Sequence, residues 1–259
     1  MTLDETCIRA FRHSFKAEKI FLCYPILFVS SLVICFVLAM LHSASDWVIF
    51  GAISVPVYLT LGLLASLSVF IHRIYYHELR GDSINYKDIF AASINRMLNG
   101  VFLSLPLMVT HLLLWVLLGV FFFLQDVPYL GTLVAVLFSM LPYAFLVVIL
   151  GLPIFTVFVL FYGSCYFAFD LTVELEPLKE KPLTIFRNFF IGLLPLALAI
   201  LFFGSIYWFT MDLFKIEENI LALTLQRIFL LIPFSLYLSP FILFFFHFGL
   251  ESYREVVKK

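Results

Sequence analysis

The sequence predicts an all-α fold, a polytopic transmembrane helix bundle of six spans arranged as three hairpins. Two observations lead to this prediction. Of the 259 residues, 63% are hydrophobic and only 13% are charged, whereas soluble domains are roughly half apolar and a quarter charged. The mean hydropathy is +1.09. A soluble fold of this composition would lack the polar residues needed to cover its core, so we expect lipid to surround most of the chain.

Six apolar runs are each long enough to cross about 30 Å of hydrocarbon. The expected spans are residues 20–41, 47–71, 101–124, 141–166, 191–213 and 228–249. Because no linker is long enough to separate two units, residues 1–259 are expected to form a single integral membrane domain. Because residues 129–169 are apolar throughout, the sequence leaves three interpretations of residues 129–140 open. They form a short external segment, part of one long helix, or part of a seventh span.

Each hairpin is expected to begin with an amphipathic helix in the headgroup layer on the cytosolic side. Residues 2–19 carry an apolar stripe made by Leu3, Cys7, Phe11 and Phe15. Thr2 and Glu5 have the spacing of a capping box, which favours a helix start here. A basic amphipathic helix next to an apolar span is typical of the membrane interface. Residues 83–99 and 182–190 precede the third and fifth spans in the same way.

The distribution of basic residues predicts the orientation of the bundle. With six spans, every Lys and Arg except Lys215 and Arg227 lies on one face. Basic residues are enriched in cytoplasmic loops, so we expect a multi-pass protein of the cell (inner) membrane with both termini in the cytoplasm. A seventh span within residues 129–169 would place Arg187 and the tail at Lys258 and Lys259 outside, which favours six spans.

His111 is the one titratable residue near the middle of an expected span, with Thr110 beside it and Trp115 one turn further on. Ionisable residues inside a membrane are costly and indicate function, so these three are candidate ligand-binding residues. A neutral imidazole is cheaper to bury than a charge, and it can hydrogen-bond a neighbouring helix. A structural role for His111 is therefore the favoured interpretation, and a proton or ligand role is the alternative.

Arg227, at the outer edge of the sixth span, is the fourth candidate ligand-binding residue. Its guanidinium is expected to extend to the external headgroups. The alternative is a partner carboxylate in an external cap, supplied by Asp126, Asp212 or Glu218.

One pair has the spacing of a catalytic motif. His77 and Asp82 match the H-x4-D spacing of phospholipid acyltransferases, in which the acid orients a histidine base. The α/β domain that normally carries this motif has no room in the chain, so acyltransferase activity is a remote hypothesis. The sequence contains no other catalytic motif, and its four cysteines lack zinc-site spacing. We expect no catalytic residues, no metal and no cofactor.

Residues 166–209 contain an aromatic-rich helix end, then D-L-x-x-E-L-E, then P-L-x-x-F-R-N, and then a new apolar run. This pattern resembles the uncharacterised bacterial six-span families grouped around the glycerophosphodiester phosphodiesterase membrane domain. Glu174 and Glu176 correspond to the acidic turn of these families. The helix start corresponds to residues 183–187, with Thr184 and Asn188 replacing a small residue and a serine. The resemblance implies a helical membrane bundle tied to lipid handling, and it carries over no catalytic residues because the hydrolase domain is absent from this sequence.

Together these features predict a non-enzymatic membrane component, acting as a scaffold, an assembly partner or a lipid-organising protein. Its expected partners are membrane lipids, with other membrane proteins or further copies of the chain as additional possibilities; the formal charge of −1 argues against nucleic acid. The alternative is a permease or channel subunit for a small solute, using His111 and the proline-kinked even-numbered spans. A polar midplane cavity reaching His111 would favour the permease, and apolar grooves open to lipid would favour the first hypothesis.

Overall fold

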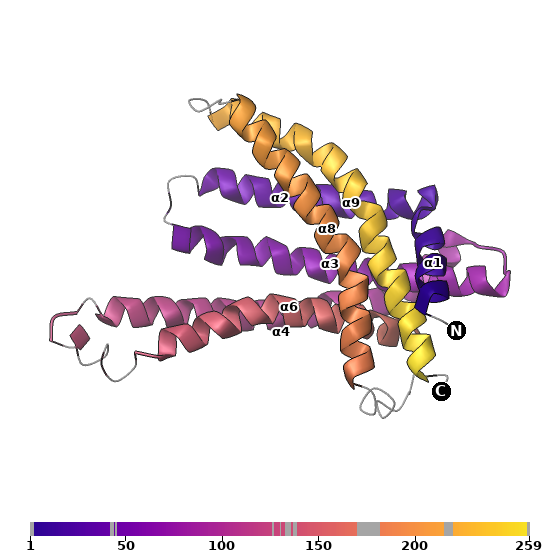
Figure 1. Cartoon of the computed structure of the whole chain (residues 1–259), viewed down its shortest axis with the longest axis horizontal. Helices are drawn as coiled ribbons and strands as arrows, with labels where there is room; N and C mark the ends of the chain where they lie inside the picture. Colours follow the sequence, from indigo (N-terminus) through magenta and orange to yellow (C-terminus); the bar gives the residue numbers. More distant parts are fainter. Residues whose placement is uncertain are drawn as a thin grey trace.

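The computed structural model of the chain describes residues 3–41, 44, 46–125, 127–129, 131–132, 136, 139–169, 182–214 and 220–257. These residues contain seven α-helices, and none of them forms a strand. The helices are α1 (Leu3–Ser14), α2 (Ala17–Met40), α3 (Asp46–Arg80), α4 (Tyr86–Gln125), α6 (Leu141–Phe169), α8 (Pro182–Phe214) and α9 (Ile220–Val257) (Figure 1). All but α1 are long and apolar enough to cross a membrane. This confirms the predicted fold class, with the six long helices of a multi-pass membrane protein.

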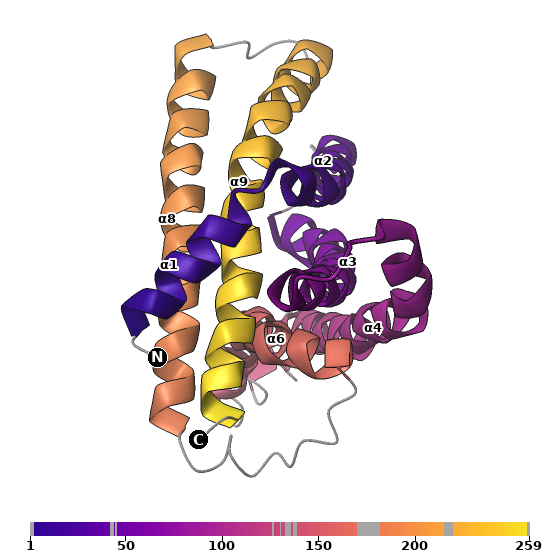
Figure 2. The same cartoon turned by 90° about the vertical axis from the view of Figure 1, so that its right-hand side faces the viewer.

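The six long helices form two groups that cross at a steep angle. Helices α2, α3, α4 and α6 run along one direction, whereas the α8–α9 hairpin runs across them (Figures 1 and 2). Helix α9 joins the groups because it packs against α2, α3, α6 and α8. Helix α1 packs on α9, at the end of the molecule where the N-terminus lies.

The core is built around the second half of α9. Every residue of this helix from Ile242 to Tyr253 is buried. The sixth span was expected to end at residue 249 and to be followed by a charged tail, but α9 continues to Val257 and Glu251 is only 2% exposed. The reason is that the carboxylate of Glu251 has partners on neighbouring segments and does not need water.

A close helix contact in this core depends on glycine. A Cβ atom at Gly249 of α9 would lie 2.9 Å from the carbonyl oxygen of Phe161 and 3.1 Å from its ring. Because glycine has no side chain, α6 can approach α9 closely there. The ring of Phe161 then packs among other aromatic rings, those of Tyr162, Phe189, Phe245 and Phe248.

The amphipathic segments differ from one another in their boundaries. The first is shorter than expected, because α1 ends at Ser14 and extended backbone at Lys16 separates it from α2. Residues 86–99 and 182–190 are helical and run without a break into the spans that follow, as the first turns of α4 and α8, whereas residues 83–85 precede α4 and are not helical. Residues 220–227, which precede the expected sixth span, are likewise the start of α9. The backbone hydrogen bonds of each helix continue without a break where the sequence changes from polar to apolar.

Candidate functional site

A partly buried cluster of charged and polar side chains lies where four segments meet. We call it the basic-end cluster; its members are Arg9, His13, Ser14, Lys16, Lys19, Tyr75, Glu78, His247, Glu251 and Arg254. They come from α1, the start of α2, the last turns of α3 and the second half of α9. Lys19 is 1% exposed and His247 is fully buried. A buried ammonium group requires close partners because burial removes it from water.

Glu78 is the acceptor at the centre of this cluster. The Lys16 ammonium lies 3.0 Å from Oε1, and the Lys19 ammonium lies 3.0 Å from Oε2. The ring of His13 adds a third contact, with Nδ1 3.1 Å from Oε2. One carboxylate on α3 thus holds the end of α1, the connection after it and the first turn of α2.

The second partner of Lys19 is His247 of α9. The ammonium donates to Nε2 of this ring at 3.0 Å, so Nε2 is unprotonated and the proton of the neutral ring is on Nδ1. Nδ1 donates to the Leu243 carbonyl oxygen at 2.7 Å and lies 3.3 Å from the hydroxyl oxygen of Ser14. Ser14 itself donates to the Ala10 carbonyl oxygen at 2.6 Å. One connected series of hydrogen bonds therefore links α1, α2 and α9.

Glu251 forms the other centre of negative charge. The hydroxyl of Tyr75 donates to its Oε1 at 2.6 Å. The guanidinium groups of Arg254 and Arg9 lie 3.4 Å and 3.9 Å from the two carboxylate oxygens. One turn before Tyr75, His72 donates from Nε2 to the Phe246 carbonyl oxygen at 2.9 Å, which adds a second tie between α3 and α9.

His13 is the titratable group of the cluster that belongs to α1. Burial lowers the pKa of His13 below its ordinary value of 6.5, and the positive charge of Lys19 lowers it further, whereas the charge of Glu78 acts in the opposite direction. His13 is therefore a neutral ring at neutral pH. In that state its Nδ1–H can donate to Glu78.

The predicted site around His111 is only partly assembled. Trp115 donates from Nε1 to His111 Nε2 at 2.7 Å, and Tyr58 of α3 lies 3.3 Å from His111 Nδ1. Both ring nitrogens therefore have partners, and the ring joins α4 to α3. Thr110 does not belong to this group, because its side chain is exposed and donates to the Pro106 carbonyl oxygen at 2.8 Å. A helix turns consecutive residues by about 100°, which separates Thr110 from His111.

Arg227 lies apart from the other three candidate residues. It is close to Cys35 of α2, and its Nε atom is buried without a hydrogen-bond partner among the described residues. The carboxylates expected to pair with it, those of Asp126, Asp212 and Glu218, lie outside the described side chains. The four predicted residues therefore do not form one site.

The pair of the acyltransferase-like motif is in contact. His77 Nδ1 lies 3.3 Å from Asp82 Oδ2, and the two side chains are 35% and 49% exposed. The turn between them has a local cause. Gly81 adopts a left-handed conformation with φ of 72°, and the Asp82 amide donates to the His77 carbonyl oxygen, as at a glycine-terminated helix end.

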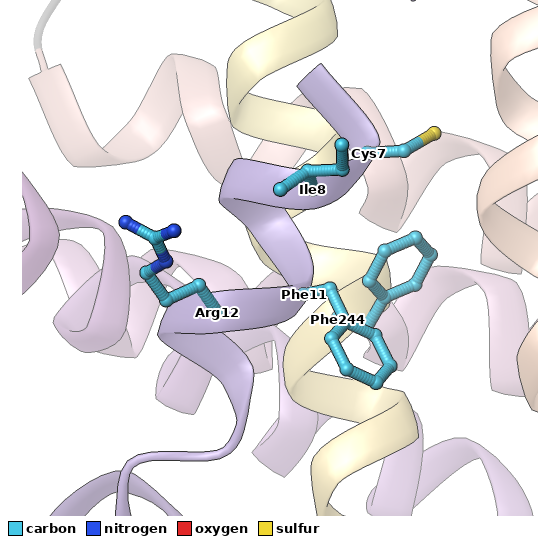
Figure 3. Close-up of a pocket in the computed structure, with 5 residues that line it drawn as sticks. All are labelled: Cys7, Ile8, Phe11, Arg12 and Phe244. Carbon is cyan, nitrogen blue, oxygen red and sulfur yellow. The ribbon is translucent and has the colours of Figure 1, made fainter. Parts of the chain in front are cut away.

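Two grooves are lined by apolar side chains. The larger, of about 540 Å³, lies between α1 and α9 and is bordered by Cys7, Ile8, Phe11, Arg12 and Phe244 (Figure 3). The smaller, of about 180 Å³, lies between α8 and α9 and is lined by Ile200, Phe203, Gly204, Tyr207, Leu230, Leu231 and Phe234. Neither groove is lined by His111.

Sequence reasoning did not identify the basic-end cluster as a site. A signal was present, because His247, Glu251 and Arg254 lie on one face of a helix, as do His72, Tyr75 and Glu78. Both stripes also belong to the same expected end of their spans. What the sequence could not provide was the packing of α9 between α1, α2 and α3, which buries those faces.

The described residues contain no group of three or more His, Cys, Asp and Glu side chains arranged to hold a metal ion. The four cysteines form no disulfide among the described residues. Nothing in the described part of the chain indicates an enzymatic activity. Comparisons of the chain with models of protein families, with curated proteins and with solved structures found no match.

Proposed function

We propose that this protein is a non-enzymatic, lipid-organising component of the cell membrane, with both termini in the cytoplasm. In this proposal the basic end of the bundle, where the basic-end cluster lies, faces the cytoplasmic leaflet. Helix α1 lies in the headgroup layer there, and the basic-end cluster holds it against α2, α3 and α9. The resemblance of residues 166–209 to membrane families tied to lipid handling is in keeping with this role and is part of the proposal.

The observation that supports it best is the orientation of α1. The helix packs on α9 through its small residues, Thr6, Ala10 and Ser14, which are buried. Three large apolar residues remain exposed, although Leu3 packs on the core: Ile8 is 62% exposed and Phe11 is 55% exposed, with Phe15 just beyond the helix 46% exposed. An amphipathic helix buries such a face in the boundary between headgroups and acyl chains.

The two apolar grooves and the pairing of His111 also favour this proposal over a permease. A permease for a polar solute needs polar groups along its route. Both nitrogens of His111 are already engaged, by Trp115 and Tyr58. Grooves lined by phenylalanine, leucine and isoleucine suit acyl chains instead.

The experiment that tests the proposal measures the environment of α1 in proteoliposomes. Nitroxide labels are placed singly at positions 8, 11 and 15, and at positions 9 and 12, in a variant without the four native cysteines. Labels at 8, 11 and 15 should collide more often with lipid-soluble oxygen than with a water-soluble nickel complex, and labels at 9 and 12 should show the opposite order. Preferential collision of all five with the nickel complex would place α1 in water and end the proposal.

A second measurement separates this role from transport. Proteoliposomes containing the wild-type protein should retain trapped small solutes as well as empty vesicles do. A solute leak that is lost in His111→Ala but retained in Thr110→Ala would instead establish the permease. Thr110 is the matched control because it is adjacent in sequence, exposed and outside the hydrogen-bond group of His111.

A further inference from the structure

The groove between α1 and α9 has an apolar floor and one charged rim. The rings of Phe11 and Phe244 meet edge to face, with centroids 6.5 Å apart. Figure 3 shows these two rings on one side and the Arg12 side chain on the opposite side of α1. The volume of about 540 Å³ is within the range of ligand pockets, about 300–1,000 Å³.

Arg12 differs from the cations of the basic-end cluster. Lys16 and Lys19 lie 3.0 Å from Glu78, and Arg9 and Arg254 face Glu251. Arg12, by contrast, is exposed and makes no ion pair with any residue that the structure describes. The groove therefore combines an apolar surface with a guanidinium group whose charge is not compensated by a neighbouring carboxylate.

We propose that this groove binds one anionic phospholipid of the adjoining leaflet, with its phosphate on Arg12 and the start of an acyl chain along Ile8, Phe11 and Phe244. The charge of the phosphodiester complements the guanidinium, which can bind two phosphate oxygens at once. The acyl chain accounts for the apolar lining, which a free phosphate would leave uncovered. The inference rests on the proposed function, because it requires α1 to lie in the headgroup layer.

The test compares two spin-labelled lipids, phosphatidylglycerol and phosphatidylcholine, with the full-length protein in vesicles. The measured quantity is the relative affinity of the two lipids for the protein, taken from the motionally restricted fraction. A basic residue near an anionic surface contributes about 1 kcal/mol, so Arg12→Gln should lower the preference for phosphatidylglycerol by about five-fold. Lys87→Gln, which removes another exposed cation of the same end, should leave the preference unchanged.

A second variant tests the apolar part of the site. Phe11→Ala removes half of the aromatic pair without changing charge, and it should weaken the restricted fraction of both lipids while their ratio changes little. Both Arg12 and Phe11 are exposed, and Phe11 reaches the core through its edge-to-face contact with Phe244.

Several outcomes would contradict the proposed phospholipid site. An unchanged lipid preference in Arg12→Gln, or an equal fall in Lys87→Gln, would attribute the preference to diffuse surface charge. Full competition by inorganic phosphate would indicate a free-anion site. A dimer that Phe11→Ala dissociates would identify a second copy of the chain as the occupant. If the labels at positions 8, 11 and 15 still contact lipid in any of these cases, the proposed function stands and only the site is lost.

Discussion

The ammonium of Lys19 and the carboxylate of Glu78 lie 3.0 Å apart in the interior of the basic end, and they join the first turn of α2 to the last turns of α3. The two side chains are 1% and 7% exposed. Lys19 also donates to His247 of α9. A buried ion pair contributes little net stability over an apolar pair, but the loss of one partner leaves a buried charge uncompensated. The pair therefore acts mainly by specifying how α2, α3 and α9 meet.

Glu78→Gln should destabilise the protein by about 3–5 kcal/mol, because Lys19 would then be a buried cation without a carboxylate. The measurement is the free energy of unfolding in detergent, with the midpoint of thermal unfolding as a second readout. Asp82→Asn is the matched control, since Asp82 is half exposed and its ion pair is with His77 at the surface. It should change stability by about 1 kcal/mol or less.

A double-mutant cycle extends this test. If the two side chains depend on each other, Lys19→Met combined with Glu78→Gln should be more stable than the sum of the single changes predicts, by about 0.5–3 kcal/mol. Strict additivity of the two changes would contradict the direct interaction.

Tyr75→Phe should cost about 1–3 kcal/mol, because it removes the hydroxyl that donates to the buried Glu251 carboxylate at 2.6 Å. The change retains the ring, which packs against His13 and His247. Tyr166→Phe serves as the control, since Tyr166 is 45% exposed. Chemical unfolding of the two variants in the same detergent makes the comparison, and equal losses would mean that the Tyr75 hydrogen bond adds nothing.

The helices could be predicted from the sequence because each long apolar run has few ways to satisfy its backbone in lipid other than as a helix. The pairing of His111 with Trp115 was also accessible, since the two residues are one helical turn apart. The Lys19–Glu78–His247 group was not, because it depends on contacts between residues separated by 59 and 228 positions. The periodicity within one segment does not indicate which ends of distant helices meet. A lysine at a helix start is, moreover, normally exposed to water.

The pH dependence of stability should include a contribution from His13. Its folded-state pKa is lowered, so above about pH 6.5 the ring is neutral whether the chain is folded or not, and stability is at its full value. As the pH falls from 6.5 through the folded-state pKa, the unfolded chain binds a proton that the folded chain does not, and stability is lost.

His13→Gln tests this contribution, because it removes the titrating ring and keeps a donor for Glu78. The groups that face His13 are unchanged in this variant: Glu78 and Tyr75 of α3, Lys16 and Lys19 beside them, and His247 of α9. Between about pH 8 and about pH 5 the wild type should lose more stability than the variant. Parallel curves of unfolding midpoint against pH would show that His13 does not titrate differently in the folded state.

Gly249→Ala should destabilise the protein by about 1–3 kcal/mol, the usual cost of overpacking a core. The added Cβ would lie 2.9 Å from the Phe161 carbonyl oxygen, and that atom belongs to the backbone of α6 and cannot rotate away. Gly151→Ala is the matched control, because Gly151 is also within a helix and no neighbouring atom lies within 4 Å of the Cβ position. Alanine favours a helix over glycine by up to about 1 kcal/mol, so the control should be neutral or stabilising. The two substitutions add the same methyl group, and opposite signs in thermal unfolding would locate the close contact between α6 and α9. A neutral Gly249→Ala would mean that these helices do not approach each other at Phe161.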